Sequence, residues 1–231
     1  AALGVEFEPL AIPRAGAAHD SQGAPRMQGE IASASAMRRL ICAGEWERAM
    51  SGTTPEAAAL YQAERGAGRT PFDYGLFGSI ALARLRSLEK SDFAALGDVC
   101  EGLENRVYAA VREAVSLPEL YEHIKTKRYT MSRVRRIVLA ACLGVPARER
   151  ACMPPYLRVL GFNARGLEIL RSAKQERLLP VVTRYAHIRR IGPQVQQVFS
   201  LECGAGDLYA LCLPCPQRCG AEQRFIPAGI V

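Results

Sequence analysis

One stretch of the sequence, residues 125–136, joins a dense cluster of positive charge to an apolar segment at residues 137–145. At about 100° per residue, one arc of a helix carries Met131, Val134, Val138, Ala141 and Val145, and the other side carries Arg133, Arg135 and Arg136. We therefore expect a core helix with a basic outer face that can meet phosphate, the alternative being a merely solvated face. The cations of the stretch are Lys125, Lys127, Arg128, Arg133, Arg135 and Arg136.

The overall composition is that of a globular chain with a modest basic excess. Its 231 residues are 49% hydrophobic and carry 30 Lys plus Arg against 23 Asp plus Glu, a formal net charge of +7. The length allows one large domain or two small ones, and a local basic excess favours nucleic acid over membrane as a partner. No apolar run approaches the ~20 residues that span a bilayer, and no signal-peptide pattern is present. We expect a cytoplasmic protein, and the sequence leaves its oligomeric state open.

The eight cysteines divide into two groups. Cys42, Cys100, Cys142 and Cys152 are scattered through helical or core-like sequence, as expected of small, reduced, apolar side chains. A second set could in principle hold zinc or an iron–sulfur cluster, but prolines place it in a turn and no histidine completes a familiar zinc spacing. We predict no metal site. The second set is Cys203, Cys212, Cys215 and Cys219.

The beginning of the chain has the pattern of an α/β domain. Residues 5–13 alternate as in a strand, and residues 20–30 form a loop. Because one strand cannot bury both faces, we expect it to be the last part of an α/β domain whose earlier part lies outside this sequence.

A turn of small residues at 31–38 opens an amphipathic helix. Ser33 and Ser35 at such a position are commonly helix caps. The alternative is a phosphate site built from backbone amides, the serine hydroxyls and Arg38 one turn later. Arg14, at the end of the predicted strand, favours that alternative, since ligands of open α/β sheets lie beyond the carboxyl ends of the strands.

The remainder is predominantly helical. A short helix is predicted over 55–64, and the spacing of apolar residues predicts helices over 73–88, 100–115 and 117–124, which we expect to form a bundle. Residues 156–183 predict a β-α-β unit, with strands at 156–162 and 178–183 around a helix at 164–174, which implies parallel pairing. A further helix covers 193–213, with Gly204 and Gly206 able to break it. A second basic cluster precedes this helix and consists of Arg184, His187, Arg189 and Arg190.

Several motifs taken together resemble one family. They include Ile31-Ala-Ser-Ala-Ser-Ala-Met-Arg38, Glu101-Gly-Leu-Glu-Asn-Arg106 and Thr126-Lys-Arg-Tyr-Thr-Met-Ser-Arg-Val-Arg-Arg136. In this order, over nearly the whole chain, they are similar to the bacterial tRNA(Met) cytidine acetate ligases, which are nucleotidyltransferase-like proteins.

The resemblance implies a fold that is α/β plus helical. Residues 1–50 would be the end of a Rossmann-like nucleotidyltransferase domain that binds ATP. Residues 51–231 would form a mainly α-helical tRNA-binding region that includes the β-α-β unit. It implies an enzyme that uses ATP, with Mg²⁺, to convert acetate to acetyl-adenylate and then acetylates N4 of the wobble cytidine of elongator methionine tRNA. Arg14, Ser33, Ser35 and Arg38 would contact ATP, and the basic stretch at 125–136 would hold tRNA phosphates. Preorganised cations and amides suit the charge on such phosphates.

One part of the family pattern has no counterpart in these residues. The histidine-containing ATP motif and the glycine-rich loop would precede residue 1, so we expect an N-terminally incomplete member with tRNA binding but without the catalytic half. Two other function classes stay open. A non-catalytic RNA-binding module would show a strong salt dependence of binding and no nucleotide affinity, whereas a nucleotidyltransferase acting on another small acid would bind nucleotide without tRNA.

Overall fold

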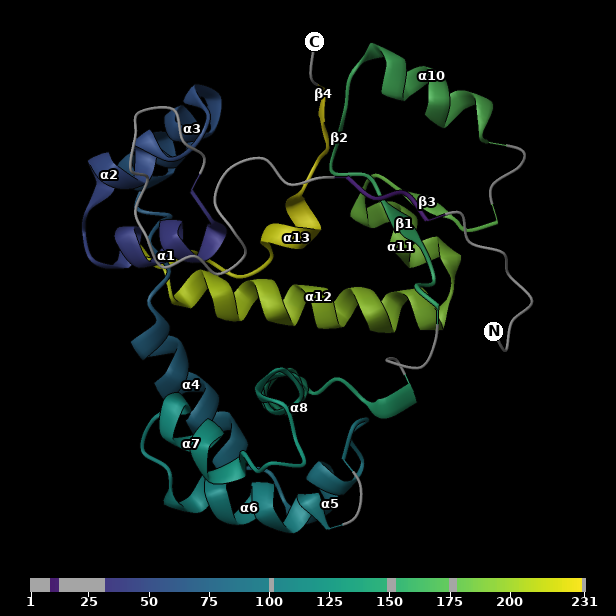
Figure 1. The fold of residues 1–231 in the computed structure, drawn as a ribbon. Coiled ribbons are helices and arrows are strands. Elements are labelled where there is room, and N and C mark those ends of the chain that lie inside the picture. Colours follow the sequence, from purple (N-terminus) through teal and green to yellow (C-terminus); the bar gives the residue numbers. More distant parts are fainter. Residues whose placement is uncertain (1–8, 13–31, 100–101, 149–152, 175–177, 230–231) are drawn as a thin grey trace. The chain divides into compact units, whose positions relative to one another are not determined.

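The computed structural model describes residues 9–12, 32–99, 102–148, 153–174 and 178–229. The chain separates into two compact units, Ala1–Pro71 and Phe72–Val231. Helices predominate in the described residues of both units, and the few strands are short (Figure 1).

The first unit contains α1 (Ala34–Cys42), α2 (Trp46–Ser51) and α3 (Pro55–Gly66). Helix α3 begins with a side-chain cap from Thr54, followed by proline in its first turn, which suits proline because the missing N–H would have no helical acceptor there. The predicted strand at 5–13 is described only over residues 9–12, which have no regular secondary structure. The small core of this unit is formed by Met37, Leu40, Ile41, Trp46 and Ala49.

The second unit begins with a helical bundle, as its apolar spacing predicts. The predicted helices at 73–88 and 117–124 are confirmed, whereas the short α5 was not predicted. Phe93 of α5 is fully buried and meets the ring of Tyr108 edge-on, with the ring centroids 6.3 Å apart. The bundle helices are α4 (Tyr74–Arg86), α5 (Lys90–Ala94), α6 (Leu103–Glu113), α7 (Leu117–Ile124) and α8 (Met131–Leu143).

Arginines join the ends of these helices to their neighbours. Arg86 donates to the carbonyl of Ala114 after α6 at 2.8 Å, and Arg112 donates to the carbonyl of Leu88 after α4 at 3.0 Å. Arg106, the last residue of the Glu101–Arg106 motif, donates to the carbonyl of Ile124 at the end of α7 at 3.0 Å. Because the last carbonyls of a helix lack intrahelical donors, these guanidinium groups stabilise the bundle, and Arg106 thereby fixes the chain where it leaves α7.

The predicted β-α-β unit is confirmed, with a different strand pattern. β1 (Leu157–Arg158) pairs in parallel with β3 (Val181–Val182), and α10 (Ala164–Ser172) lies between them in sequence. The expected strand at 156–162 is interrupted: its second part, β2 (Gly161–Phe162), pairs in parallel with β4 (Ala228–Gly229) near the end of the chain. Strands this short have too few residues to show an alternating pattern.

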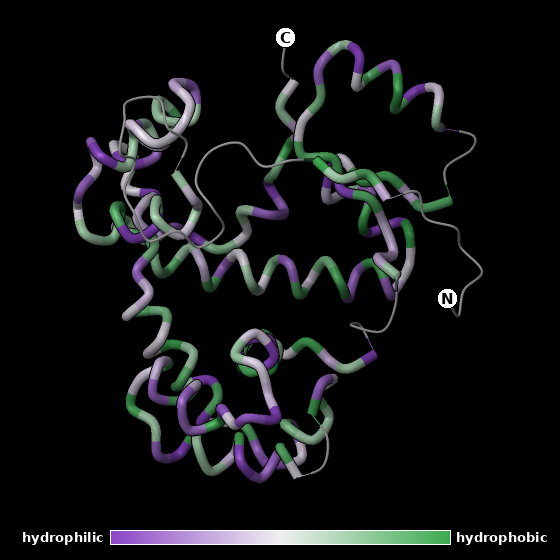
Figure 2. The backbone as a smooth tube through the Cα atoms, viewed as in Figure 1, coloured by the Kyte–Doolittle hydropathy of each residue, from purple (hydrophilic) through white to green (hydrophobic). Residues whose placement is uncertain are grey.

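The last helices are α11 (Tyr185–Ile191), α12 (Pro193–Leu211) and α13 (Ala221–Arg224). Helix α12 runs through both of its glycines without a break, and polar and apolar residues alternate along it (Figure 2). A Cβ at Gly206 would lie 3.1 Å from the Glu222 side chain on α13, so glycine permits the close approach of these helices. The core of this part is formed by Tyr156, Val182, Ile188, Val195, Phe199 and Cys203.

Arg158 of β1 ties these elements together. Its guanidinium donates to Glu202 on α12 and to Glu222 on α13, and it lies 5.5 Å from the ring centroid of Phe199. The hydroxyl of Tyr156 donates to the same Glu202 carboxylate at 2.6 Å. Burial, helped by this acceptor, raises the pKa of Tyr156 well above its usual range.

Candidate nucleic-acid and nucleotide sites

The basic stretch forms a turn followed by the first turns of α8. Thr126 and Tyr129 make an antiparallel bridge, which leaves Lys127 and Arg128 exposed at the tip. The Thr130 hydroxyl accepts the N–H of Arg133 at 3.3 Å and so caps α8. The helix N-terminus, with its partial positive charge, therefore lies directly beside two exposed cations.

The centre of the predicted apolar arc is confirmed, since Val134, Val138 and Ala141 are buried. Met131 and Val145, at its two ends, are half-buried, and Ile137 is buried as well. Arg135 and Arg136 are exposed. One face of α8 thus packs in the bundle core and the other carries cations.

Arg133 is an exception on the basic face, because its guanidinium is held within the protein. Its Nε and Nη2 atoms donate to the carbonyl oxygen of Asp98 at 3.1 and 2.7 Å. The same guanidinium carbon lies 4.9 Å from the ring centroid of Tyr129. Arg133 is half-buried, and its first role in the structure is to join α8 to the segment that follows α5.

The other cations of the stretch differ in how freely they can meet an anion. Arg136 pairs with the Asp98 carboxylate at 3.4 Å, with 55% of its own side chain exposed, so the pair is a weak surface one. Arg135 lies 5.8 Å from the ring centroid of Tyr121. Burial raises the pKa of Tyr121, and nearby Arg135 opposes that rise. Lys125 is half-buried and its Nζ donates to the Thr126 carbonyl at 3.0 Å.

Sequence reasoning missed the groups that shape this surface. Asp98 lies 35 residues before Arg133, so no local spacing connects the two. Its positive φ of 71° is tolerated by Asp better than by most residues, but a single Asp after glycine is a weak signal. The detectable clue was Tyr129, which lies between the cations in sequence, and Tyr121, which precedes them, because an arginine packs well over an aromatic face.

The predicted ATP residues lie at the start of α1, apart from Arg14, which falls outside the described residues. Ser33 is buried, and its hydroxyl accepts the N–H of Ala36 at 3.1 Å, so it is the cap of α1. The backbone carbonyl of Ser35 accepts a hydrogen bond from Arg39 at 3.4 Å. Arg38 is exposed. Ser33, Ser35 and Arg38 thus lie at the cap and within the first one and a half turns of α1.

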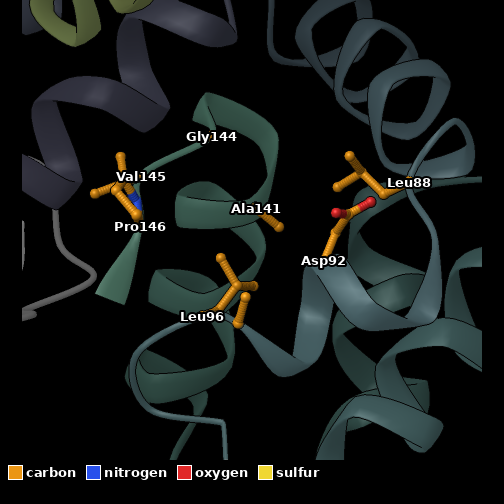
Figure 3. Close-up of a pocket in the computed structure, with 8 residues that line it drawn as sticks. Leu88, Asp92, Leu96, Ala141, Gly144, Val145 and Pro146 are labelled. Atoms are coloured by element: carbon orange, nitrogen blue, oxygen red, sulfur yellow. The ribbon is translucent and has the colours of Figure 1, made fainter. Parts of the chain in front are cut away.

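A small apolar pocket lies between α5 and the end of α8 (Figure 3). Its volume is about 220 Å³, and Leu88, Leu96 and Ala141 are among the residues that line it. The acidic side chain in its lining is Asp92, whose carboxylate already accepts the N–H of Glu89 at 2.8 Å. This pocket suits an apolar group and has none of the cations that a phosphate would need.

The cysteines do not form a metal site among the described residues, where no group of three or more potential ligands is close enough to hold an ion. Cys203 and Cys212 are buried, and Cys215 and Cys219 are exposed. Burial raises the pKa of the Cys203 thiol to about 11, which keeps it protonated. Of the scattered set, Cys142 is buried as expected, Cys42 is exposed, and Cys100 and Cys152 lie outside the described residues.

Within the described part of the chain, no helix combines the length and the apolar character required to cross a bilayer.

The sequence matches the HIGH Nucleotidyl Transferase family over residues 1–224. It is 31% identical to the tRNA(Met) cytidine acetate ligase of Acetivibrio thermocellus, over 94% of this chain and 54% of that protein. It is 29% identical to the enzyme of the same name from Syntrophomonas wolfei, over 96% of this chain and 55% of that protein. The chain therefore spans about half the length of the curated relatives it matches.

Solved structures give the same result. The apo crystal structure of Thermotoga maritima TmcAL superposes with a TM-score of 0.85 at 27% identity, over 95% of this chain and 55% of that one. The same protein bound with alpha-thio ATP superposes with a TM-score of 0.79, over 87% of this chain and 52% of that one. These likenesses confirm the resemblance carried by the motifs, and the chain belongs to the HIGH nucleotidyl transferase family, alongside the tRNA(Met) cytidine acetate ligases.

Proposed function

We propose that this chain acts in ATP-dependent acetylation of N4 of the wobble cytidine in elongator methionine tRNA, a cytoplasmic reaction. The observation that carries this proposal is the similarity to tRNA(Met) cytidine acetate ligases over 94% of the chain. Acetate would attack the α-phosphorus of ATP, with release of pyrophosphate, to give acetyl-adenylate. The cytidine amine would then attack the acetyl carbonyl, and AMP would leave.

The α7–α8 turn and the basic face of α8 are the proposed tRNA surface. Lys127, Arg128 and Arg135 are exposed and reach solvent from two adjoining elements. Arg136 joins them by exchanging its long, exposed pair with Asp98 for a phosphate. Lys125 and Arg133 stay in the proposed surface, where their bonds to backbone carbonyls hold the turn and the helix in place for the other cations.

The start of α1 is the proposed ATP-phosphate site, together with Arg14. A helix N-terminus presents backbone amides and a partial positive charge to an anion, and exposed Arg38 adds a full charge one turn along. Since the Ser33 hydroxyl caps α1, its part is to fix the geometry of that turn. Mg²⁺ would enter with ATP as its counter-ion.

The first test is binding of elongator methionine tRNA, against an unrelated tRNA, over a series of salt concentrations. Lys127→Ala/Arg128→Ala/Arg135→Ala removes three of the proposed phosphate contacts, which lowers the magnitude of the salt slope by about 2 to 2.7 at roughly 0.7 to 0.9 per contact. The matched control, Arg84→Ala/Lys90→Ala/Arg218→Ala, removes the same charge from other exposed positions. Equal losses in the two variants would contradict a tRNA site at α8.

The second test measures transfer of labelled acetate to the tRNA with ATP present, and exchange of pyrophosphate into ATP dependent on acetate. Both activities would support the proposed reaction and would contradict the expectation that this chain binds tRNA without catalysing the reaction. Salt-sensitive tRNA binding without any nucleotide affinity would assign the chain to the class of non-catalytic RNA-binding modules. Exchange supported by another small acid, without tRNA binding, would assign it to a different nucleotidyltransferase reaction.

A further inference from the structure

A segment away from α8 carries as large a net positive charge as the basic stretch at 125–136, which has six cations and no acidic residue. Residues 156–192 contain eight Lys plus Arg and two Asp plus Glu, a net +6 (8 − 2), compared with +7 for the whole chain. Among the described residues of this segment, Arg158 forms ion pairs within the protein, with Glu202 and Glu222. Arg184, Arg189 and Arg190 are exposed, so these cations can meet an external partner.

Helix α11 is anchored in the core by Ile188 and carries part of this charge on its exposed sides. Ile188 is 1% exposed and packs in the core with Phe199. At about 100° per residue, Arg190 lies about 200° from Ile188 around the helix and so points away from that core. Arg184, Arg189 and Arg190 are all exposed, and among the described residues no carboxylate forms an ion pair with them. This contrasts with α8, where Asp98 partly neutralises Arg136.

The stability of α11 does not explain the positions of all three arginines. Arg189 and Arg190 lie in the last turn of α11, where cations interact favourably with the helix dipole. Arg184 is at the N-cap position, where its side chain makes no capping bond and its charge opposes the dipole. A cation in that place gains nothing from the helix, which favours an anionic partner outside the protein.

An aromatic side chain lies among these cations. The ring of Tyr185 stacks on Phe199 with the centroids 5.5 Å apart and the planes 23° from parallel. Tyr185 as a whole is still 39% exposed. A partly exposed ring held by stacking on the core can also stack on a base, as in proteins that combine aromatic side chains with basic grooves.

We propose that the α11 surface, formed by Arg184, Tyr185, Arg189 and Arg190, is a second RNA-binding surface that contacts the sugar-phosphate backbone of the same tRNA. The inference rests on the proposed function for the identity of the RNA. It goes beyond that function by adding a surface separate in sequence from α8, and by predicting that the two surfaces contribute independently to the salt dependence of binding.

The test compares tRNA binding by the chain and by Arg184→Ala/Arg189→Ala/Arg190→Ala between 50 and 200 mM salt. Loss of three phosphate contacts lowers the magnitude of the salt slope by about 2 to 2.7. The ratio of the affinities at the two salt concentrations then becomes smaller by roughly 20- to 40-fold. Replacement of the same arginines by lysine keeps the charge and is expected to keep the slope. The far-UV circular dichroism and the melting temperature of each variant show that the fold is intact.

Each outcome decides the question. A reduced slope in the alanine variant and a retained one in the lysine variant support the α11 surface. If the α8 variant loses tRNA while the α11 alanine variant binds like the parent chain, the proposed function stands and the α11 surface is refuted. No tRNA binding by the parent chain refutes both. Binding to vesicles containing 30% phosphatidylserine that disappears in the α11 variant, with tRNA binding unchanged, assigns the surface to a membrane and overturns the proposal.

Discussion

Arg133 and Arg135 are two residues apart in the same basic stretch, yet the structure predicts opposite consequences for their substitution by alanine. The Arg133 guanidinium donates twice to the Asp98 carbonyl and lies over Tyr129. Arg135 is exposed, and its nearest ring centroid is 5.8 Å away. Arg133→Ala should therefore destabilise the second unit, and Arg135→Ala should reduce tRNA binding without destabilising it.

The size of the effect follows from these contacts. A hydrogen bond from a charged donor contributes about 1.5 to 3 kcal/mol, and both bonds of Arg133 end on one oxygen, so we count them as one. The cation–π contact adds about 0.5 to 1 kcal/mol. Because the side chain is half-buried, solvent screening favours the low end, about 2 kcal/mol in total. For a unit of this size the melting temperature falls by roughly 4 to 8 °C. Arg135→Ala should change stability by less than about 0.5 kcal/mol.

The measurement is urea unfolding followed by far-UV circular dichroism, which reports mainly the helices of the second unit. Trp46, the only tryptophan in the sequence, lies in the first unit, and its fluorescence is expected to follow the same transition in both variants as in the parent chain. Double substitution with Tyr129→Leu isolates the cation–π contribution. If Arg133→Ala costs less than about 0.5 kcal/mol, or if both variants lose equal stability, the anchoring role derived for Arg133 is wrong.

Three further predictions concern the second unit. Gly204→Ala should raise the free energy of unfolding by up to about 1 kcal/mol, because alanine is the better helix former and its Cβ meets nothing within 4 Å. Gly206→Ala should not show that gain, because its Cβ would lie 3.1 Å from Glu222. In a Glu222→Ala background, Gly206→Ala should be more stable than Glu222→Ala alone. Urea titrations of Gly204→Ala, Gly206→Ala, Glu222→Ala and the double variant check this. The free energy of unfolding should fall between about pH 9 and 11, because the Cys203 thiol ionises at about pH 9 in the unfolded chain and at about pH 11 when buried. The loss is up to about 2.7 kcal/mol. Unfolding measured at pH 8 and 10.5 should show a smaller pH-dependent loss for Cys203→Ala than for the parent chain. Phe93→Ala should cost about 3 to 5 kcal/mol in thermal or urea unfolding, since that ring is fully buried, and a loss below 1 kcal/mol would contradict its place in the core.

The candidate tRNA surface could be predicted from the sequence as far as its local geometry goes. The periodicity of residues 131–145 indicates which side of α8 packs, whereas the cap at Thr130, where the helix begins, was not predicted. The ion pair and carbonyl bonds to Asp98 could not be predicted, because that residue joins α8 only after the bundle has formed. The prediction that the whole basic face can meet phosphate was therefore too simple, because the number of cations does not reveal which of them form contacts within the protein.

The features that could be predicted from the sequence depend on neighbours within a few residues: the bundle helices other than α5, the β-α-β order and the motifs of the family. The other features arise only from contacts between distant segments. Helix α12 continues through Gly206 because contact with α13 outweighs the low helix propensity of glycine. β2 pairs with residues 228–229 because their backbone donors and acceptors need partners once the chain has folded back. Local spacing sets the tendency of each segment to form a helix or a strand. Only the folded chain determines which distant segment satisfies its remaining polar groups and buries its apolar face.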